Sequence, residues 1–121
     1  MRIHLIKEPT IWDFTKKHAR SFSSMNEWLN KIHQSDWRKP EDISSTFPSA
    51  DILGRGSNRV VFDVGGNTYR IICKYLFGDK QAHLFIKWIG THAEYTKLCN
   101  KNEQYKISMY YILWKQPLNT K

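Results

Sequence analysis

The stretch Arg59-Val-Val-Phe-Asp-Val-Gly-Gly-Asn-Thr-Tyr-Arg-Ile-Ile-Cys-Lys-Tyr75, followed by Leu84-Phe-Ile-Lys-Trp-Ile-Gly-Thr-His-Ala-Glu-Tyr95, decides the fold. It holds three β-rich runs, separated by Gly65-Gly66-Asn67 and by Gly78-Asp79-Lys80. Glycine and asparagine tolerate the positive φ angles that tight hairpin turns need. We therefore expect three consecutive antiparallel strands joined by two hairpins.

Two-residue turns at both separators predict a strand register. The first turn, Gly66-Asn67, gives the pairs Asp63–Arg70 and Arg59–Lys74, and the second, Gly78-Asp79, gives the pairs Lys74–His83 and Arg70–Lys87. One side of the sheet, which we call the basic face, then carries Arg59, Arg70, Lys74, His83 and Lys87. The opposite face is nearly all apolar. We expect helices to cover the apolar face and to leave the basic face open, either as a solvated surface or as a site for a polyanion.

Composition narrows the class of partner. The 121 residues suffice for one domain with its own core, and 19 Lys plus Arg against 11 Asp plus Glu give a net charge of +8. This balance favours nucleic acid, an acidic protein or an anionic membrane surface. The two cysteines are too few for a disulfide framework, so we expect a cytoplasmic protein. We expect no membrane span, because no apolar run approaches ~18 residues. The histidine and cysteine spacings predict neither a metal site nor a cofactor.

The flanking segments predict the remaining elements. Residues 2–6 read as a strand, and Pro9 begins a helix with Lys16 and Lys17 on its outer part. A capping box at Ser24 and Glu27 predicts the start of a second helix. Residues 36–56 read as an irregular loop pinned along one sheet edge. Another capping box, at Thr91 and Glu94, predicts a helix that begins at His92. Residues 107–114 fit either an extra strand or a partner-dependent tail.

Four segments together resemble the HigB toxins of bacterial toxin–antitoxin modules, which belong to the RelE/ParE superfamily. They are Phe47-Pro-Ser49, Arg59-Val-Val-Phe-Asp-Val-Gly-Gly-Asn67, Tyr69-Arg-Ile-Ile72 and Ile89-Gly-Thr-His-Ala-Glu-Tyr95. The resemblance covers residues 1–98, which we take as the toxin domain, and leaves 99–121 as a tail. It implies an α+β fold of RelE/ParE type, in which an N-terminal strand and two helices pack on one face of an antiparallel sheet and a short helix follows the last meander strand.

The resemblance also implies an activity and partners. HigB toxins are mRNA endoribonucleases that commonly act on ribosome-bound message. They are held inactive by a HigA antitoxin, usually a helix-turn-helix protein, and the complex of the two represses their shared promoter.

The residues of the basic face fit such chemistry. Cleavage by the neighbouring 2′-hydroxyl needs proton transfer and positive charge around the phosphate. Arg70 suits a phosphate clamp, a role that Lys87 and Lys74 can share, while His92 titrates near neutrality and Tyr95 can orient the phosphate, stack on a base or relay a proton. The residues expected to bind RNA around this catalytic group are Arg59, Lys74, His83, Lys16 and Lys17.

Structural roles compete with each of these assignments. Arg70 can simply pair with Asp63, His92 can decorate the first turn of its helix, and Tyr95 can be a core ring. Two other functions also fit: a ParE-like toxin that inhibits DNA gyrase, and a non-catalytic RNA- or DNA-binding module.

Overall fold

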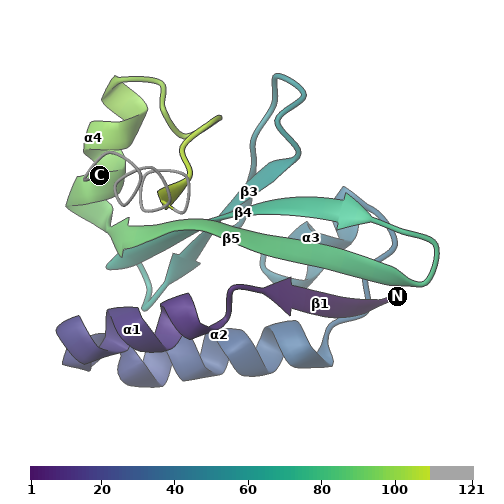
Figure 1. The fold of residues 1–121 in the computed structure, drawn as a ribbon, viewed down its shortest axis with the longest axis horizontal. Coiled ribbons are helices and arrows are strands. Elements are labelled where there is room, and N and C mark those ends of the chain that lie inside the picture. The colour runs from purple at the N-terminus through teal and green to yellow at the C-terminus, as the bar shows by residue number, and fades with distance from the viewer. Residues whose placement is uncertain (110–121) are drawn as a thin grey trace, which may run out of the picture.

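Five strands form one sheet, in the order β1-β5-β4-β3-β2, in a computed structural model that describes residues 1–109 (Figure 1). The strands are β1 (Arg2–Ile6), β2 (Asp51–Ile52), β3 (Arg59–Val64), β4 (Tyr69–Phe77) and β5 (Gln81–Thr91). The helices are α1 (Pro9–Lys17), α2 (Phe22–Gln34), α3 (Pro40–Thr46) and α4 (His92–Asn100), with a short 3-10 turn at Ala19–Ser21. β1 pairs with β5 in parallel, and the other pairs are antiparallel. The predicted α+β class is confirmed.

The first hairpin has the predicted register. Asp63 lies opposite Arg70 and Arg59 lies opposite Lys74. The chain turns with positive φ angles at Gly65 and Gly66, 65° and 66°. A side chain would strain the backbone there, which is why glycine occupies both positions.

The predicted register of the second hairpin is wrong. The pairs are Leu76–His83 and Lys74–Phe85, and Arg70 lies opposite Gly90. The turn is at residues 79–80, because Gly78 donates its N–H to the carbonyl oxygen of Gln81 at 2.9 Å. Near the turn the shift amounts to two residues, and an even shift keeps His83, Phe85 and Lys87 on their predicted face. Beyond a β-bulge in β5 the shift is three residues, so Trp88 and Gly90 change face.

The apolar face carries the main core. α1, α2 and α3 pack on it, and α1 and α2 lie on the side of the sheet away from α4 (Figure 1). The predicted stripe of α2 is buried here, namely Met25, Trp28, Leu29 and Ile32. It packs against strand residues that include Phe62, Ile71 and Ile86.

The basic face is open only in part, contrary to the prediction. Leu98 of α4 is buried against Val61 and Ile72, and Tyr95, Trp88 and two residues after α4, Tyr105 and Ile107, pack around them. Val61 and Ile72 alternate with the cations along their strands, so the basic face has an apolar centre that must be covered. A second, smaller core therefore lies under α4.

Two local predictions are wrong. α2 begins at Phe22 rather than at Ser24, because the 3-10 turn at Ala19–Ser21 runs directly into the helix. The segment 36–56 is not irregular throughout, since it contains α3 and β2. Apolar residues pin it to the sheet as expected: Trp37, Ile43, Phe47 and Leu53 are buried and Ile52 is partly buried. The carboxylate of Asp42 accepts hydrogen bonds from the backbone N–H groups of Arg38 and Lys39 at 2.7 and 3.2 Å. This acidic residue therefore caps the N-terminus of α3.

The C-terminal prediction falls mostly outside the described residues. Of residues 107–114, the structure describes 107–109, so the alternatives of a strand and a tail stay predictions, as does the domain division at residue 98. Residues 1–109 contain no helix that is both long enough and apolar enough to span a membrane.

Candidate active site on the basic face

A β-bulge shapes the centre of the basic face. Cys73 pairs with Ile86 and Ile72 pairs with Trp88, which leaves Lys87 as an extra residue in β5. Ile86 and Ile89 both belong to the main core, so the two residues between them turn to the basic face. The bulge thus places Lys87 and Trp88 side by side on this face.

Lys87 lies among other cations. Burial lowers the pKa of its ammonium group, and the nearby positive charges of Arg59 and Lys74 lower that pKa further. Its Nζ atom sits 4.2 Å from the ring centroid of Phe85. An ammonium group that is partly desolvated and repelled by neighbours releases its proton more readily than an ordinary lysine. Lys87 can therefore bind a phosphate through its positive charge or act as a proton-transfer group.

Arg59 is buried beside this lysine, with 5% of its surface exposed. Its Nη1 group donates a hydrogen bond to the carbonyl oxygen of Gln104 at 3.1 Å. Burial lowers the pKa of the guanidinium, yet arginine remains charged at neutral pH. The contact ties the segment after α4 to a fixed positive charge under the basic face.

Arg70 is held on several sides and is 7% exposed. Its Nε group lies 3.0 Å from a carboxylate oxygen of Asp63, Nη1 donates to the carbonyl oxygen of Tyr69 at 3.0 Å, and Nη2 donates to the side-chain oxygen of Asn67. The predicted cross-strand pair of Arg70 with Asp63 is therefore formed. Of the five N–H groups of the guanidinium, these three contacts leave two for another acceptor.

Helix α4 positions Tyr95 and His92. Its capping box is the predicted one, with Thr91 accepting from the N–H of Glu94 at 3.2 Å and Glu94 accepting from the N–H of Thr91 at 2.8 Å. His92 is exposed, and its N–H donates to the carbonyl oxygen of Thr68 at 2.9 Å, which joins the start of α4 to the β3–β4 hairpin.

Tyr95 is half-buried, with its ring centroid 6.3 Å from that of Trp88. Burial raises the pKa of its phenol well above the ordinary value. The hydrogen bond with Cys99 and the charge of Asp51 act in the same direction, whereas Arg70 opposes them. The hydroxyl therefore stays protonated at neutral pH and can donate a hydrogen bond but cannot act as a base.

A cavity of about 570 Å³ lies at the other end of the basic face. It is lined by Ile6, Asn58, Lys74, Tyr75, Leu76, His83 and Phe85. Leu76 is 64% exposed at its rim, an unusual position for a large apolar side chain. A cationic and aromatic lining of this kind suits the phosphate and base of a single-stranded nucleic acid.

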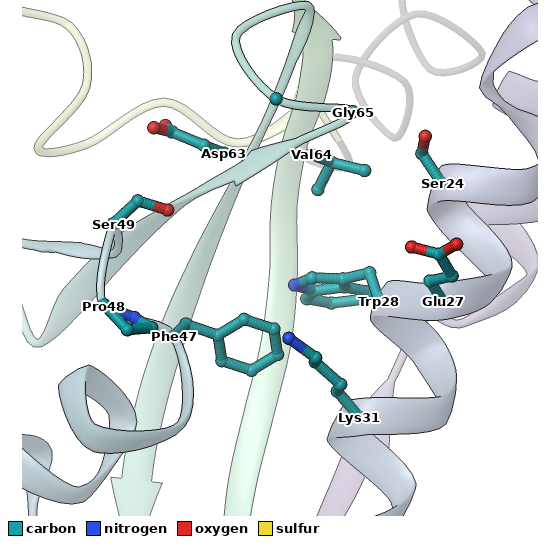
Figure 2. A pocket seen from close by; sticks show the side chains of 11 residues that line it. Ser24, Glu27, Trp28, Lys31, Phe47, Pro48, Ser49, Asp63, Val64 and Gly65 are labelled. Carbon is teal, nitrogen blue, oxygen red and sulfur yellow. The ribbon is translucent and has the colours of Figure 1, made fainter.

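A second cavity, of about 410 Å³, lies between α2 and the end of β3, and Asp63 is part of its lining (Figure 2). Glu27 and Lys31 project from α2 toward it, and the loop with Pro48 and Ser49 faces them. The indole N–H of Trp28 is buried there and has no hydrogen-bond partner in residues 1–109. With two acidic residues and one cation in its lining, this cavity suits a polyanion less well than the first.

The structure does not bring the predicted catalytic residues together in the predicted way. Lys87 lies with Arg59 and Lys74, while Tyr95 lies near Arg70, and Lys87 is not beside Arg70 as the predicted register required. Lys16 and Lys17 are exposed on α1, on the other side of the sheet from α4 (Figure 1).

Sequence reasoning missed Trp88, Phe85 and Gln104. Ile86 and Ile89, three residues apart in a β-rich run, break the two-residue alternation, and this spacing was the signal for the bulge. Nothing in the sequence marks the carbonyl oxygen of Gln104.

Known proteins match most of the chain. The family model of the HigB toxin, described as the RelE-like toxic component of a toxin–antitoxin system, matches residues 21–98. The mRNA interferase HigB of Escherichia coli O6:H1 is 30% identical over 96 residues, which cover 79% of this chain and 91% of the relative. The mRNA interferase toxin HigB of Escherichia coli K12 is 29% identical over 93 residues, which cover 77% of this chain and 88% of the relative. The mRNA interferase HigB of Shigella flexneri has the same identity and coverage.

Proposed function

The chain belongs to the HigB toxin family of RelE-like toxic components of toxin–antitoxin systems, and on this premise we propose that it is an endoribonuclease that cleaves mRNA. Relatives of 29–30% identity carry the name mRNA interferase. The observation that carries the proposal is the gathering of Lys87, Arg59 and Lys74 beside a cavity large enough for a nucleotide. Cleavage of message halts translation, which accounts for toxicity.

The proposed reaction is an attack by the ribose 2′-hydroxyl that needs no metal ion. The 2′-oxygen bonds to phosphorus, the bond from phosphorus to the 5′-oxygen breaks, and the products are a 2′,3′-cyclic phosphate and a 5′-hydroxyl. One group takes the proton of the 2′-hydroxyl and another supplies a proton to the 5′-oxygen. His92 and Lys87 are the proposed proton-transfer groups, because an imidazole can both accept and donate a proton and because burial lowers the pKa of Lys87.

Positive charge and hydrogen bonds complete the proposed site. Arg70 uses its remaining N–H groups on the scissile phosphate, and the protonated hydroxyl of Tyr95 donates to a phosphate oxygen. The RNA strand continues past Arg59 and Lys74 into the cavity beside His83. Lys16 and Lys17 contact phosphates farther along the strand or on the ribosome.

The proposed partners follow the family. A HigA-type helix-turn-helix antitoxin neutralises the toxin, and operator DNA is bound through the complex of the two rather than by the toxin alone. The message is cleaved on the ribosome, in the cytoplasm. The net charge of +8 favours association with an acidic antitoxin surface and with ribosomal RNA.

A matched pair of lysine variants tests this function. Lys87→Met should lower the single-turnover rate of cleavage of ribosome-bound message by ~10²–10³-fold, the scale for loss of one preorganised charge. Lys80→Met removes the same charge from the exposed β4–β5 turn and should leave the rate unchanged. Thermal melts of both proteins check that they are folded.

The products distinguish the mechanisms. Ends with a 5′-hydroxyl that still form in the presence of a chelator support attack by the 2′-hydroxyl, whereas 5′-phosphate ends contradict it. Pulse labelling of cells separates the toxin classes. A fall in DNA synthesis while protein synthesis continues would favour the gyrase-directed activity of ParE-like toxins.

A further inference from the structure

Two histidines from distant parts of the chain meet on the sheet surface. His4 of β1 and His83 of β5 are paired in the parallel register, and their Nδ1 atoms lie 3.2 Å apart. The ring centroids are 5.3 Å apart and the ring planes make an angle of 71°. In a neutral pair, one Nδ1–H donates to the lone pair of the other Nδ1.

The separation of the two nitrogens matches a metal chelate. A tetrahedral ion with metal–nitrogen bonds of about 2.0–2.1 Å holds two ligand nitrogens about 3.3–3.4 Å apart. An ion can therefore replace the shared proton if the nitrogens move by a few tenths of an ångström and each ring turns so that its lone pair points at the ion. We propose that His4 and His83 form a chelating site for a divalent transition metal ion, with both Nδ1 atoms as ligands.

The donor set selects the kind of ion. Imidazole nitrogens suit Zn²⁺, Ni²⁺ and Cu²⁺, whereas Ca²⁺ and Mg²⁺ prefer oxygen ligands. Within residues 1–109, no three His, Cys, Asp or Glu side chains gather where they could hold a metal. The remaining coordination positions are therefore filled by water or by an external ligand. Lys74, which lines the cavity together with His83, favours an anion in those positions.

Binding changes the protonation of the pair without changing its charge. Coordination uses the lone pair of each Nδ1, so both rings carry their proton on Nε2 in the bound state. The ion also adds a side-chain link between β1 and β5, two strands joined by a parallel backbone ladder. Since it binds the folded chain and not the separated histidines of the unfolded chain, it raises the melting temperature. The proposal does not depend on RNA cleavage.

Titration calorimetry with ZnSO₄, repeated with NiCl₂, tests the site on the full chain. His4→Gln and His83→Gln should each weaken binding at least tenfold and abolish the rise in melting temperature. The control is His33→Gln, because His33 lies 3.1 Å from a carboxylate oxygen of Glu8 and forms another two-ligand candidate. Melts without metal confirm that each variant folds.

Three outcomes overturn the proposal: no binding by the unaltered protein, unchanged binding by His4→Gln and His83→Gln, or loss of binding in His33→Gln. Histidine ¹⁵N spectra give an independent reading. Zinc should shift the Nδ1 resonances of His4 and His83 and leave those rings protonated at Nε2. Coordination through Nε2 contradicts the geometry.

Discussion

Ile71 and Ile72 are neighbours in β4, both fully buried, yet they face opposite sides of the sheet. Ile71 lies in the main core, surrounded by apolar residues from α1, α2, α3 and the strands. Ile72 lies under α4 in a small cluster. On its own strand, the side chains that flank Ile72 on the same face are Arg70 and Lys74. The sheet thus separates a face that supplies stability from one in which apolar contacts hold charged groups in place.

The difference between the two faces shows how a small domain can hold cationic side chains where they can bind a phosphate. Removing charged groups from water costs free energy unless hydrogen bonds or opposite charges compensate it. On the basic face, Arg70 forms an ion pair with Asp63, and Arg59 donates a hydrogen bond to the carbonyl oxygen of Gln104. Lys87, in contrast, lies near the positive charges of Arg59 and Lys74. The uncompensated lysine is the group most available to a phosphate.

The largest expected effect comes from truncating the two isoleucines in turn. Ile71→Ala should lower the free energy of unfolding by about 4 kcal/mol, because the crowded core cannot collapse into the space. Ile72→Ala should cost about 2–3 kcal/mol, since α4 can move toward the sheet. Urea denaturation measures both. Equal losses would show that the two faces contribute alike.

The same pair should separate stability from activity. At a temperature where both variants are folded, Ile72→Ala should reduce RNA cleavage more than Ile71→Ala, because it loosens the support of α4. A greater loss of cleavage in Ile71→Ala would contradict the assignment of the site to the basic face.

The next effect concerns the ion pair of Arg70 and Asp63. Arg70→Ala should cost about 2 kcal/mol of stability, because it leaves a half-buried carboxylate without its partner. This estimate lies below the range for fully buried pairs, since the Asp63 side chain is 30% exposed. The double variant with Asp63→Ala should be more stable than Arg70→Ala alone. Additive losses in this double-mutant cycle would mean that the pair contributes little.

Much of this arrangement could be predicted from the sequence, and the failures have physical causes. The β3–β4 hairpin and the capping box of α4 were predictable because local residues dictate them. The β4–β5 register was not, because Gly78-Asp79 and residues 79–80 are both acceptable turns, and the bulge at Lys87 adds one more residue to the shift. The contact between His4 and His83 was invisible, since histidine spacing along the chain says nothing of strands paired across 79 residues.

The candidate site was harder to predict than the fold. The cations were placed on the correct face by alternation alone, but alternation does not reveal what covers a face. The apolar side chains of Val61 and Ile72 among the charges were the available sign that α4 would pack there.

A smaller effect should distinguish α1 from the basic face. Exchanging Lys16 and Lys17 for Gln should weaken RNA binding and reduce the slope of log affinity against log salt by up to ~1.4, about 0.7 for each lost phosphate contact. The single-turnover rate at saturating enzyme should not change, because α1 lies away from the proposed site. A reduced rate would place α1 in the chemical step, and an unchanged slope would remove it from the RNA path.

The smallest expected effect is a pH dependence of stability that belongs to Lys87. Its pKa in the folded state lies below the ordinary value of 10.5, so between the two values the unfolded chain binds more protons. Stability contributed by this group therefore rises with pH through that window, and its destabilising effect is complete below the folded pKa. The gain should be under about 1 kcal/mol, because Lys87 is partly exposed to solvent.

Urea denaturation at about pH 7 and about pH 9.5 gives the change in the free energy of unfolding with pH for the unaltered protein and for Lys87→Met. The change in the unaltered protein minus the change in the variant is the gain that belongs to Lys87. Other titrating groups, Tyr95 among them, are common to both proteins and cancel. The unaltered protein should gain more stability on raising the pH than Lys87→Met does, while Lys80→Met should behave like the unaltered protein. If Lys87→Met gains as much, the lysine is neither desolvated nor repelled by Arg59 and Lys74 in solution, and the distinction between compensated and uncompensated cations on the basic face fails.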